Sequence, residues 1–461
     1  MIPVTTYRDR PVAVFGLARS GIAAAKALLA GGAKVAGWDD NEASRDRAEK
    51  AGVPLVSPGD LDWARQAALV LAPGVPLYHP APHPVVALAR AAQCPIIGDI
   101  ELFAEMRQAL PINTVVAITG TNGKSTTTAL VTHIVNACGG EAVACGNIGA
   151  PVLELDPLGA DGIYVIEISS YQIELTHALH PEIAVLLNIT PDHLDRHGGM
   201  AGYVAAKRAM LAWQQPTDMA IVGIDDDYGL ETIRELEGQG HTVRPVSVGQ
   251  RLERGIFVED GQLWDLKFSQ DEPVCDLRDV VTLPGAHNWQ NAACAYAVAR
   301  ELGYAPDSIA SGIRSFAGLA HRLEYAGRLS GVDYYNDSKA TNAEAAARAL
   351  DCFENVHWIL GGQPKESGLD ALMPLFGRVA KAYTIGEASN DFAAALRAAG
   401  VAVEQSETLD RALGSASRNA RAGEVVLLSP ACASFDQYPN FEARGDHFKA
   451  LVQGLKQEAC A

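Results

Sequence analysis

Short apolar runs alternate with longer mixed segments along most of the chain. The runs at 12–16, 115–119, 162–168 and 424–430 are rich in β-branched residues, and each ends at glycine or polar residues. Runs of this length between turn residues are typical of buried strands, and the segments between them have helical length. Strands that alternate with helices in this way predict parallel sheets, which places the chain in the α/β class.

The order of these runs predicts three domains, in agreement with the length of 461 residues. We expect a Rossmann-like N-terminal domain over 1–110, a central domain over 111–318 and a Rossmann-like C-terminal domain over 319–461. The sheet of the first domain is expected to continue through apolar runs at 69–76 and 95–103. The strands expected in the third domain are 332–337, 356–362, 381–386 and 424–430.

Residues 241–283 depart from the parallel pattern. Apolar and polar residues alternate there with a period of two, as in strands with one solvated face, and Asp260-Gly261 is a hairpin signal. The central domain is therefore predicted as a mainly parallel sheet with a small antiparallel insertion. An alanine-rich helix is expected over 285–303.

The stretch from Val115 to Thr128, VVAITGTNGKSTTT, predicts a nucleoside triphosphate site. A strand that turns through glycines into a helix aims several backbone N–H groups at one anion. Lys124 adds a charge for the terminal phosphates, and Ser125 offers a hydroxyl to magnesium. The generic P-loop pattern requires a glycine where this chain has Ile118, so a glycine-rich turn that binds nothing is the alternative.

A second glycine turn, from Gly16 to Gly21, follows the first predicted strand. Its spacing is G-x-A-x-x-G, and Asp39 follows about where an acid that binds ribose would fall. The second glycine of a dinucleotide fingerprint is replaced by Ala18. Binding of NAD is one interpretation, and a Rossmann-like domain that binds another ligand is the other.

Polar residues end several strands of the central domain. The carboxyl ends of parallel strands meet at one edge of a sheet, where ligands bind. Those expected near the phosphate loop are Asn147, Glu167, Ser169, Ser170, His193 and Asp195. Glu167 is a hard oxygen ligand suited to magnesium, although a strand-end carboxylate in solvent would look the same. By residue type alone, His193 is a weaker candidate and Lys207 resembles a solvated helix lysine.

Two polar segments of the third domain have a plain structural alternative. Arg322, in His321-Arg322-Leu323-Glu324, has a guanidinium that suits phosphoryl oxygens, but it also suits a surface ion pair. Residues 336–342 end a strand and precede an alanine-rich helix. Asp337 and Ser338 could therefore bind a ligand or simply cap the helix.

Composition and charge exclude several classes of protein. The formal net charge of −18 argues against a protein that coats nucleic acid or anionic lipid. The eight cysteines form no C-x-x-C pair, so neither a zinc nor a redox framework is expected. No apolar run approaches the ~18 residues of a membrane span, and the N-terminus lacks an export signal. We expect a cytoplasmic monomer that binds small molecules, without a nucleic-acid or membrane partner.

Taken together, these segments resemble the Mur ligase family of ATP-dependent amide-forming enzymes over essentially the whole chain. The motifs that carry the resemblance are TGTNGKST, GNIG, EISSYQ, HLDRH, AHNWQNAAC, HRLE and NDSKATN. The opening VFGLARSG and the terminal SPACASFDQYPNFEARGDHF resemble the branch that adds D-glutamate to UDP-N-acetylmuramoyl-L-alanine. This implies a peptidoglycan precursor enzyme whose products are ADP and phosphate.

The resemblance also implies roles for individual residues. The ATP phosphates are expected on Gly120, Thr121, Asn122, Gly123, Lys124, Ser125 and Thr126, and the rest of the nucleotide on Asn291, Arg322 and Asp337. Two magnesium ions are expected on Ser125, Glu167, His193 and a carbamylated Lys207. Catalysis is expected from Lys124, Glu167, His193 and Lys207. The UDP-muramoyl substrate is expected on Leu17, Ala18, Arg19, Asp39, Asp40, Asn41, Gly74, Asn147 and Ser169, and D-glutamate on Lys339, Thr341, Lys365, Ser429 and Phe435.

The implied reaction explains these residue types. A carboxylate is a poor acyl donor, so ATP first converts it to an acyl phosphate, which an amine then attacks. Negative charge develops on oxygen in both steps, so cations act by positioning and electrostatics. Two alternatives stay open: a related ligase such as folylpolyglutamate synthetase, and a nucleotide-sensing protein that has no catalytic activity.

Overall fold

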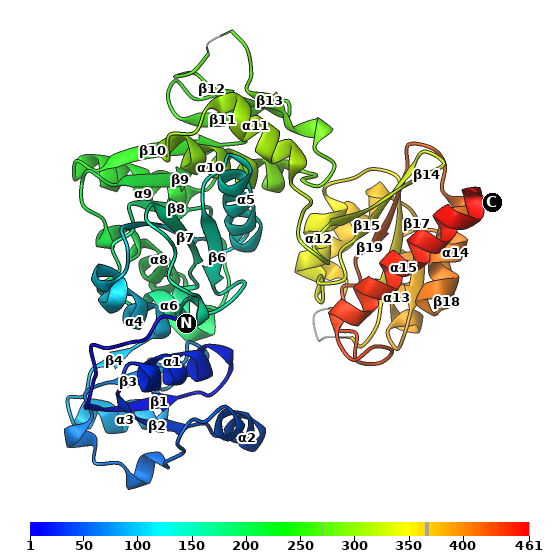
Figure 1. Cartoon of the computed structure of the whole chain (residues 1–461). Helices are drawn as coiled ribbons and strands as arrows, with labels where there is room; N and C mark the ends of the chain where they lie inside the picture. Colours follow the sequence, from blue (N-terminus) through cyan, green and yellow to red (C-terminus); the bar gives the residue numbers. More distant parts are fainter. Residues whose placement is uncertain (270, 365–367, 461) are drawn as a thin grey trace. The chain divides into compact units, whose positions relative to one another are not determined.

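The structure, a computed structural model, describes residues 1–269, 271–364 and 368–460. Its described residues form two compact units. The first contains Met1–Asp276 and Gln290–Arg314, and the second contains Leu277–Trp289 and the chain from Ser315 onward. The first unit holds two sheets and the second holds one (Figure 1). The expected domain boundaries at 110 and 318 stay predictions.

The first sheet of the first unit is parallel and has the strand order β2-β1-β3-β4. Its strands are β1 (Pro11–Phe15), β2 (Lys34–Trp38), β3 (Leu69–Leu71) and β4 (Ile96–Ile97). Its helices are α1 (Arg19–Ala30), α2 (Glu42–Lys50), α3 (Pro84–Ala91) and α4 (Asp99–Met106). The expected strand at 95–103 is therefore wrong beyond Ile97. Acidic residues in the first turn of α4 favour a helix there, and most of its side chains are buried.

The second sheet of the first unit has nine strands in the order β13-β12-β11-β10-β9-β8-β5-β7-β6. The parallel strands are β5 (Asn113–Thr119), β6 (Ala142–Gly146), β7 (Gly162–Glu167), β8 (Ile183–Leu186), β9 (Met219–Gly223), β10 (Thr242–Ser247) and β11 (Ile256–Glu259). The helices that accompany them are α5 (Lys124–Ala137), α6 (Ser170–Ile173), α7 (Leu194–His197), α8 (Met200–Arg208), α9 (Asp227–Gly238), α10 (Ala286–Glu301) and α11 (Pro306–Ser315). The helix expected over 285–303 is confirmed by α10.

The predicted antiparallel insertion needs correction, because β10 is parallel to both β9 and β11. Only β12 (Gln262–Asp265) and β13 (Cys275–Asp276) run antiparallel, and they extend the central sheet. The predicted hairpin at Asp260-Gly261 is confirmed, with φ of 49° and 76°. Both residues thus adopt the positive φ that a two-residue hairpin loop of type I′ requires.

The sheet of the second unit has the order β14-β15-β19-β16-β17-β18, and only β14 is antiparallel to its neighbour. Its strands are β14 (Glu324–Leu329), β15 (Val332–Asn336), β16 (Val356–Gly361), β17 (Val379–Ile385), β18 (Val403–Glu407) and β19 (Val425–Leu428). Its helices include α12 (Ala343–Leu350), α13 (Ser389–Ala398), α14 (Leu409–Asn419) and α15 (Phe441–Cys460). The four strands expected here are confirmed, whereas β14 and β18 are additions.

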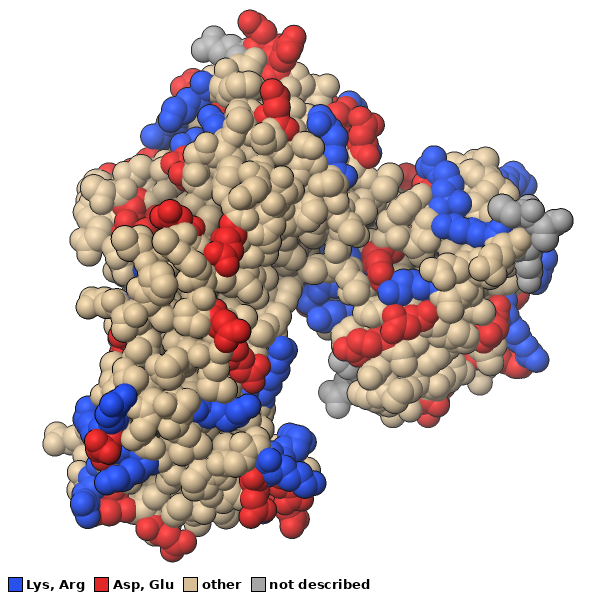
Figure 2. Space-filling view, in the orientation of Figure 1, with Lys and Arg blue, Asp and Glu red and all other residues tan. Residues whose placement is uncertain are grey.

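The surface in view carries both signs of charge. Figure 2 shows Lys and Arg side chains interspersed with Asp and Glu over several elements of this face. Within the described residues, no helix combines the length and the apolar character needed to cross a bilayer.

Candidate functional site

The phosphate loop joins β5 to α5 in the conformation that its glycines permit. Gly120 and Gly123 have φ of 152° and 84°. A Cβ on Gly123 would lie 2.1 Å from Asn291 Oδ1, so this helix start requires glycine both for its backbone angle and for space. Asn291, predicted from its motif, thus packs directly against the loop.

The neighbouring strand end holds the loop in place. Asn188, after β8, accepts hydrogen bonds from Thr121 N at its carbonyl (2.8 Å) and from Asn122 N at Oδ1 (2.9 Å). The Thr121 hydroxyl lies 3.0 Å from Tyr203 OH. The loop backbone is therefore fixed before any ligand arrives.

Two lysines meet at the carbonyl oxygen of Gly120. Lys124 Nζ donates to it at 2.9 Å and Lys207 Nζ at 2.8 Å. Lys207 is only 1% exposed. The interpretation of Lys207 as a solvated helix lysine, which rested on its residue type alone, is therefore wrong. Burial, and then the charge of Lys124, lower the pKa of Lys207 to about 7. The neutral amine is thus accessible near neutral pH.

Glu167 ends β7 beside the loop strand, and its carboxylate is buried. Asn147 Nδ2 donates to Glu167 Oε1 at 2.7 Å. No described residue donates a hydrogen bond to the buried Oε2. A buried carboxylate oxygen without a partner is a natural position for a cation.

His193 immediately precedes α7 and lies in the left-handed region, with φ of 50°. Its ring lies 5.2 Å from that of Tyr171, and its side chain is 53% exposed. In the described ranges, no group of three or more His, Cys, Asp and Glu side chains is placed to hold a metal. The predicted metal set contains only two residues of those types, Glu167 and His193, so it stays a prediction.

A cavity of about 260 Å³ within the first unit is lined by several of these residues. Its lining residues are Pro73, Gly74, Lys124, Asn147, Ser169, Ser170, Tyr171, Asp192, His193, Tyr203 and Lys207. Seven of these were expected near the loop or the substrate. Pro73, Tyr171, Asp192 and Tyr203 were missed, and Asp195, which was expected near the loop, does not line the cavity. Tyr203 lies one helical turn before Lys207, a spacing that could have revealed it.

At the N-terminal glycine turn, the carboxylate of Asp39 accepts hydrogen bonds from nearby backbone N–H groups. Asp39 accepts hydrogen bonds from Leu17 N (2.6 Å) and Asn41 N (2.8 Å). The Leu17 side chain is fully buried, while Ala18 and Arg19 are exposed at the start of α1. Ala18 and Arg19 are therefore accessible to a ligand, whereas Asp39 stabilises the backbone of the turn.

The other substrate residues expected here also have partners. Asn41 caps α2 by accepting from Ser44 N, and Asp40 pairs with His83 at 3.0 Å. Gly74 O accepts a hydrogen bond from Arg196 at 3.0 Å, which joins the two sheets of this unit near the cavity. The Ser169 hydroxyl takes part in the capping box of α6.

In the second unit, Asp337 and Ser429 lie together at adjacent strand ends. Ser429 Oγ donates to Asp337 Oδ2 at 2.9 Å, and Leu323 N donates to Oδ1 at 3.2 Å. Burial raises the pKa of Asp337 to about 7, although these bonds and Arg322 oppose the change. Helix α12 is capped by Asn342, so Asp337 is not its cap.

Sequence inspection missed Arg444, which is buried in the second unit. Its guanidinium donates to Ser338 Oγ and to the carbonyl groups of Ser338, Cys432 and Ala433. Burial lowers its pKa to about 10. A buried arginine thus joins the loop after β15 to the loop after β19.

The remaining expected residues of the second unit lie at its surface. Lys339 and Arg322 are exposed, Thr341 is half-buried and Phe435 is 67% exposed. Lys339 Nζ lies 5.3 Å from the centroid of the Phe441 ring. Lys365 lies outside the described residues.

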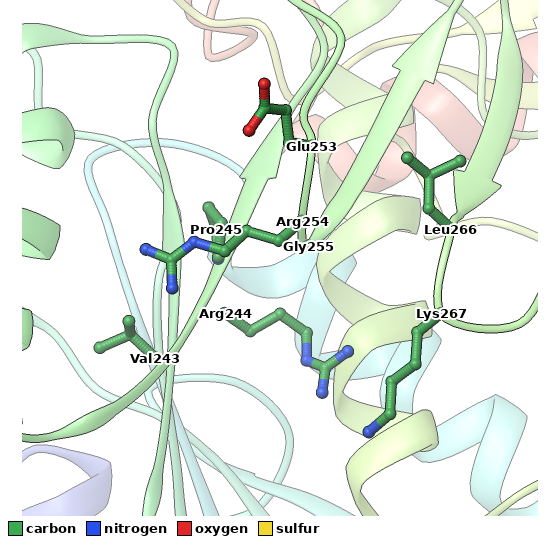
Figure 3. Close-up of a pocket in the computed structure, with 8 residues that line it drawn as sticks. All are labelled: Val243, Arg244, Pro245, Glu253, Arg254, Gly255, Leu266 and Lys267. Atoms are coloured by element: carbon green, nitrogen blue, oxygen red, sulfur yellow. The ribbon is translucent and has the colours of Figure 1, made fainter. Parts of the chain in front are cut away.

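Another cavity, of about 380 Å³, lies at the edge of the central sheet near β10 and β12. Figure 3 shows Arg244 and Lys267 directed toward one another, with Arg254 pointing away. Arg244 and Arg254 are already paired with Glu301 and Glu237. No residue expected in the functional site lines this cavity.

Comparison with known proteins gives a consistent result over the whole chain. Residues 118–299 match the model of the Mur ligase middle domain, and residues 321–432 match that of the Mur ligase glutamate ligase domain. The UDP-N-acetylmuramoylalanine–D-glutamate ligase of Phenylobacterium zucineum is 50% identical, covering 99% of this chain and 98% of that protein. The enzyme of the same name from Paramagnetospirillum magneticum is 48% identical over all of both chains.

Solved structures share the fold at lower identity. The UDP-N-acetylmuramate-alanine ligase of Thermotoga maritima matches with a TM-score of 0.57 at 17% identity, covering 96% of this chain and 99% of that one. A pseudomurein peptide ligase type C from Methanothermus fervidus matches with a TM-score of 0.53 at 16% identity, covering 97% and 100%.

Proposed function

The chain belongs to the Mur ligase family, and from this membership we propose that it joins D-glutamate to UDP-N-acetylmuramoyl-L-alanine at the expense of ATP. The observation that carries the proposal is the cavity that Lys124 of the phosphate loop lines together with Asn147 and Lys207, where Asn147 donates a hydrogen bond to Glu167. Full-length similarity to D-glutamate ligases supports this acceptor.

The first unit supplies the groups that acyl phosphate formation needs. Backbone N–H groups at the start of α5 and the charge of Lys124 suit the phosphates of ATP. In the structure Lys124 donates to Gly120 O and Thr121 O, so we expect its ammonium to leave these carbonyls when phosphate binds. The loop itself need not reorganise, because Asn188 fixes it.

Magnesium, when bound, would neutralise the charge that develops on the phosphoryl oxygens. We assign the ion to Ser125, His193 and Glu167, and the Glu167 oxygen that receives no hydrogen bond from a described residue supports this assignment. A cationic Lys207 would repel a metal. Its neutral amine can instead react with carbon dioxide to give a carbamate and a proton, which supplies anionic oxygens. We further propose that the site binds two magnesium ions and that Lys207 is carbamylated. The protein is proposed to be a monomer in the cytoplasm.

The binding of the remaining groups is part of the same proposal. UDP-N-acetylmuramoyl-L-alanine is assigned to the exposed turn at Ala18 and Arg19 and to the cavity beside Gly74 and Asn147. D-glutamate is assigned to the second unit, where Lys339 offers a cation for a carboxylate. Asn291, Arg322 and Asp337 are assigned to the nucleotide.

Phosphate release with different acceptors tests the proposal. With ATP, Mg²⁺ and UDP-N-acetylmuramoyl-L-alanine, we expect phosphate release that depends on D-glutamate and is far weaker with L-glutamate, lysine or diaminopimelate. Equal rates with diaminopimelate would assign the chain to a sister ligase. Release only when a folate replaces UDP-N-acetylmuramoyl-L-alanine and L-glutamate is the amine would favour folylpolyglutamate synthetase, and ATP binding without any release would favour a sensing protein.

A further inference from the structure

We infer that Ser170, oriented by His197 and Glu174, accepts a hydrogen bond from the amide N–H of the substrate's alanyl residue. This inference rests on the proposed function and adds a contact within the same cavity. The three side chains form a continuous chain of hydrogen bonds. Glu174 Oε1 lies 3.1 Å from His197 Nδ1, and His197 Nε2 lies 2.9 Å from Ser170 Oγ.

Glu174 determines the direction of the hydrogen bonds. A carboxylate only accepts hydrogen bonds, so a neutral His197 carries its proton on Nδ1 and donates it to Glu174. Nε2 is then an acceptor, and the Ser170 hydroxyl must donate to it. Because a hydroxyl has a single proton, Ser170 Oγ offers only its lone pairs to the cavity that it lines.

Packing holds this histidine rigidly. The His197 side chain has no exposed surface, and its ring stacks on Tyr171 with centroids 5.3 Å apart and an interplanar angle of 14°. The Tyr203 ring lies 5.4 Å away on α8. Both tyrosines also line the cavity, so His197 is fixed between the wall of the cavity and Glu174.

The neighbouring Ser169 differs in a useful way. Its hydroxyl donates to Gln172 Oε1 at 3.1 Å and accepts from Gln172 N at 3.3 Å. Its proton and one lone pair are thus used to start α6. Ser170 keeps its acceptor capacity for the cavity, which makes it the better-placed serine for substrate.

The position of the cavity selects the substrate group. Phosphoryl transfer requires the reacting carboxylate to lie beside the phosphates bound by Lys124, which lines the same cavity as Ser170. The alanyl amide nitrogen is bonded to the carbon that bears this carboxylate. It is therefore the N–H nearest to the reacting group, and it needs an acceptor such as Ser170 Oγ.

The test compares natural substrate with an analogue whose alanyl nitrogen is methylated and so has no N–H. Using the full-length protein with ADP and Mg²⁺, we expect Ser170→Ala to weaken binding of UDP-N-acetylmuramoyl-L-alanine about tenfold, the size of one hydrogen bond. Binding of the methylated analogue should change less than twofold. His197→Phe keeps an aromatic ring and should reproduce both results, with the KM for ATP unchanged in either variant.

Thr176→Val is the matched control, because Thr176 is buried in the same segment, donates to Gln172 O and does not line the cavity. It should leave both Kd values unchanged. Equal weakening of both ligands by Ser170→Ala, or no weakening of either, would overturn the inference. Absence of D-glutamate-dependent phosphate release in the unaltered protein would overturn the proposed function instead. If His197→Phe fails to fold, Ser170→Ala alone decides the question.

Discussion

Two buried polar clusters, one in each unit, differ in how fully their groups are paired within the protein. In the first unit, Glu167 Oε2 receives no hydrogen bond from any described residue. Lys207 is buried beside a second cation, and among the residues that the structure describes its Nζ donates only to the carbonyl of Gly120. These groups have capacity left for a ligand.

The cluster of the second unit is closed upon itself. Asp337 receives hydrogen bonds from Ser429 and from the backbone of Leu323, and Arg444 donates to one hydroxyl and three carbonyl groups. Each polar atom named here has a partner inside the unit. Such a cluster stabilises the loops that it joins, whatever else those loops bind.

The difference between the two clusters indicates which buried charged residues take part in ligand binding or catalysis. A buried charge without sufficient partners lowers stability and persists where a ligand completes it. Substitutions in the first cluster should therefore change activity more than stability. Substitution of Arg444, the residue of the second cluster to which no ligand is assigned, should do the reverse, and four experiments can break or sharpen this contrast.

The largest effect is expected for Lys207→Ala. Ligation should fall at least about 1,000-fold, or about 4 kcal/mol in activation free energy, because the metal-facing anion is lost. The melting temperature should change little, since the variant loses one hydrogen bond, from Lys207 Nζ to Gly120 O, together with the cost of burying an ionisable group. Acetate should restore part of the activity by filling the vacated space. Lys50→Ala, at an exposed position of α2, is the control and should be fully active. Loss of folding in Lys207→Ala would break the contrast.

The second effect is expected for Arg444→Met. Four acceptors would lose their donor, so the free energy of unfolding of the second unit should fall by about 3 kcal/mol. Hydrogen exchange at increasing denaturant concentration measures the unfolding of each unit separately. The exchange rates in the first unit should not change. Arg397→Met, at an exposed site of α13, should have little effect. An unchanged second unit would show that the closed cluster adds no stability.

Much of the fold could be predicted because buried parallel strands leave a strong local pattern. The elements that escaped prediction are those where the pattern is weak. Strand β18, with sequence VEQSE, is a polar edge strand whose stability comes from its neighbour β17. Strand β4 has only two residues and is followed by α4. The apolar residues of α4 suggested a strand, but the acidic residues in its first turn favour a helix.

The site was predictable where it depends on strand ends and not where it depends on packing between distant elements. Lys124 and Asn147, which line the cavity, and Glu167, which accepts a hydrogen bond from Asn147, follow from the rule that parallel strand ends converge. The burial of Lys207 and the bonds of His197 depend on how α6, α7 and α8 pack. No spacing along the chain encodes those contacts.

A third test concerns Lys124, which belongs to the first cluster. Lys124→Ala should lower turnover about 100-fold, the effect of removing one charge from the transition state. Its melting temperature should stay close to that of the unaltered protein, since the loop is held by Asn188. Phosphate release and thermal unfolding measure the two quantities. Turnover within tenfold of the unaltered protein would remove the assignment of this loop to the terminal phosphate.

The smallest effect concerns the pH dependence of Asp337 in the second cluster. An aspartate in an unfolded chain has a pKa near 3.9, whereas burial raises the pKa of Asp337 to about 7. Between these values the folded protein binds a proton that the unfolded chain does not. The contribution of Asp337 to stability is therefore complete below about pH 4 and is lost as the pH rises toward 7.

Asp337→Asn removes this titration but retains an oxygen that accepts one hydrogen bond. We compare the free energy of unfolding of the variant with that of the unaltered protein at each pH. This difference should shift in favour of the variant by about 1–2 kcal/mol between pH 5.5 and pH 8. Thermal unfolding at both pH values measures the difference, and any hydrogen bond lost in the variant shifts both values equally. Asp391→Asn, at an exposed position of α13, should show no such dependence. A stability difference that is the same at both pH values would mean that Asp337 stays ionised in the folded protein. The second cluster would then contain a buried carboxylate that keeps its charge, in addition to the paired guanidinium of Arg444, and the description of this cluster as closed upon itself would fail.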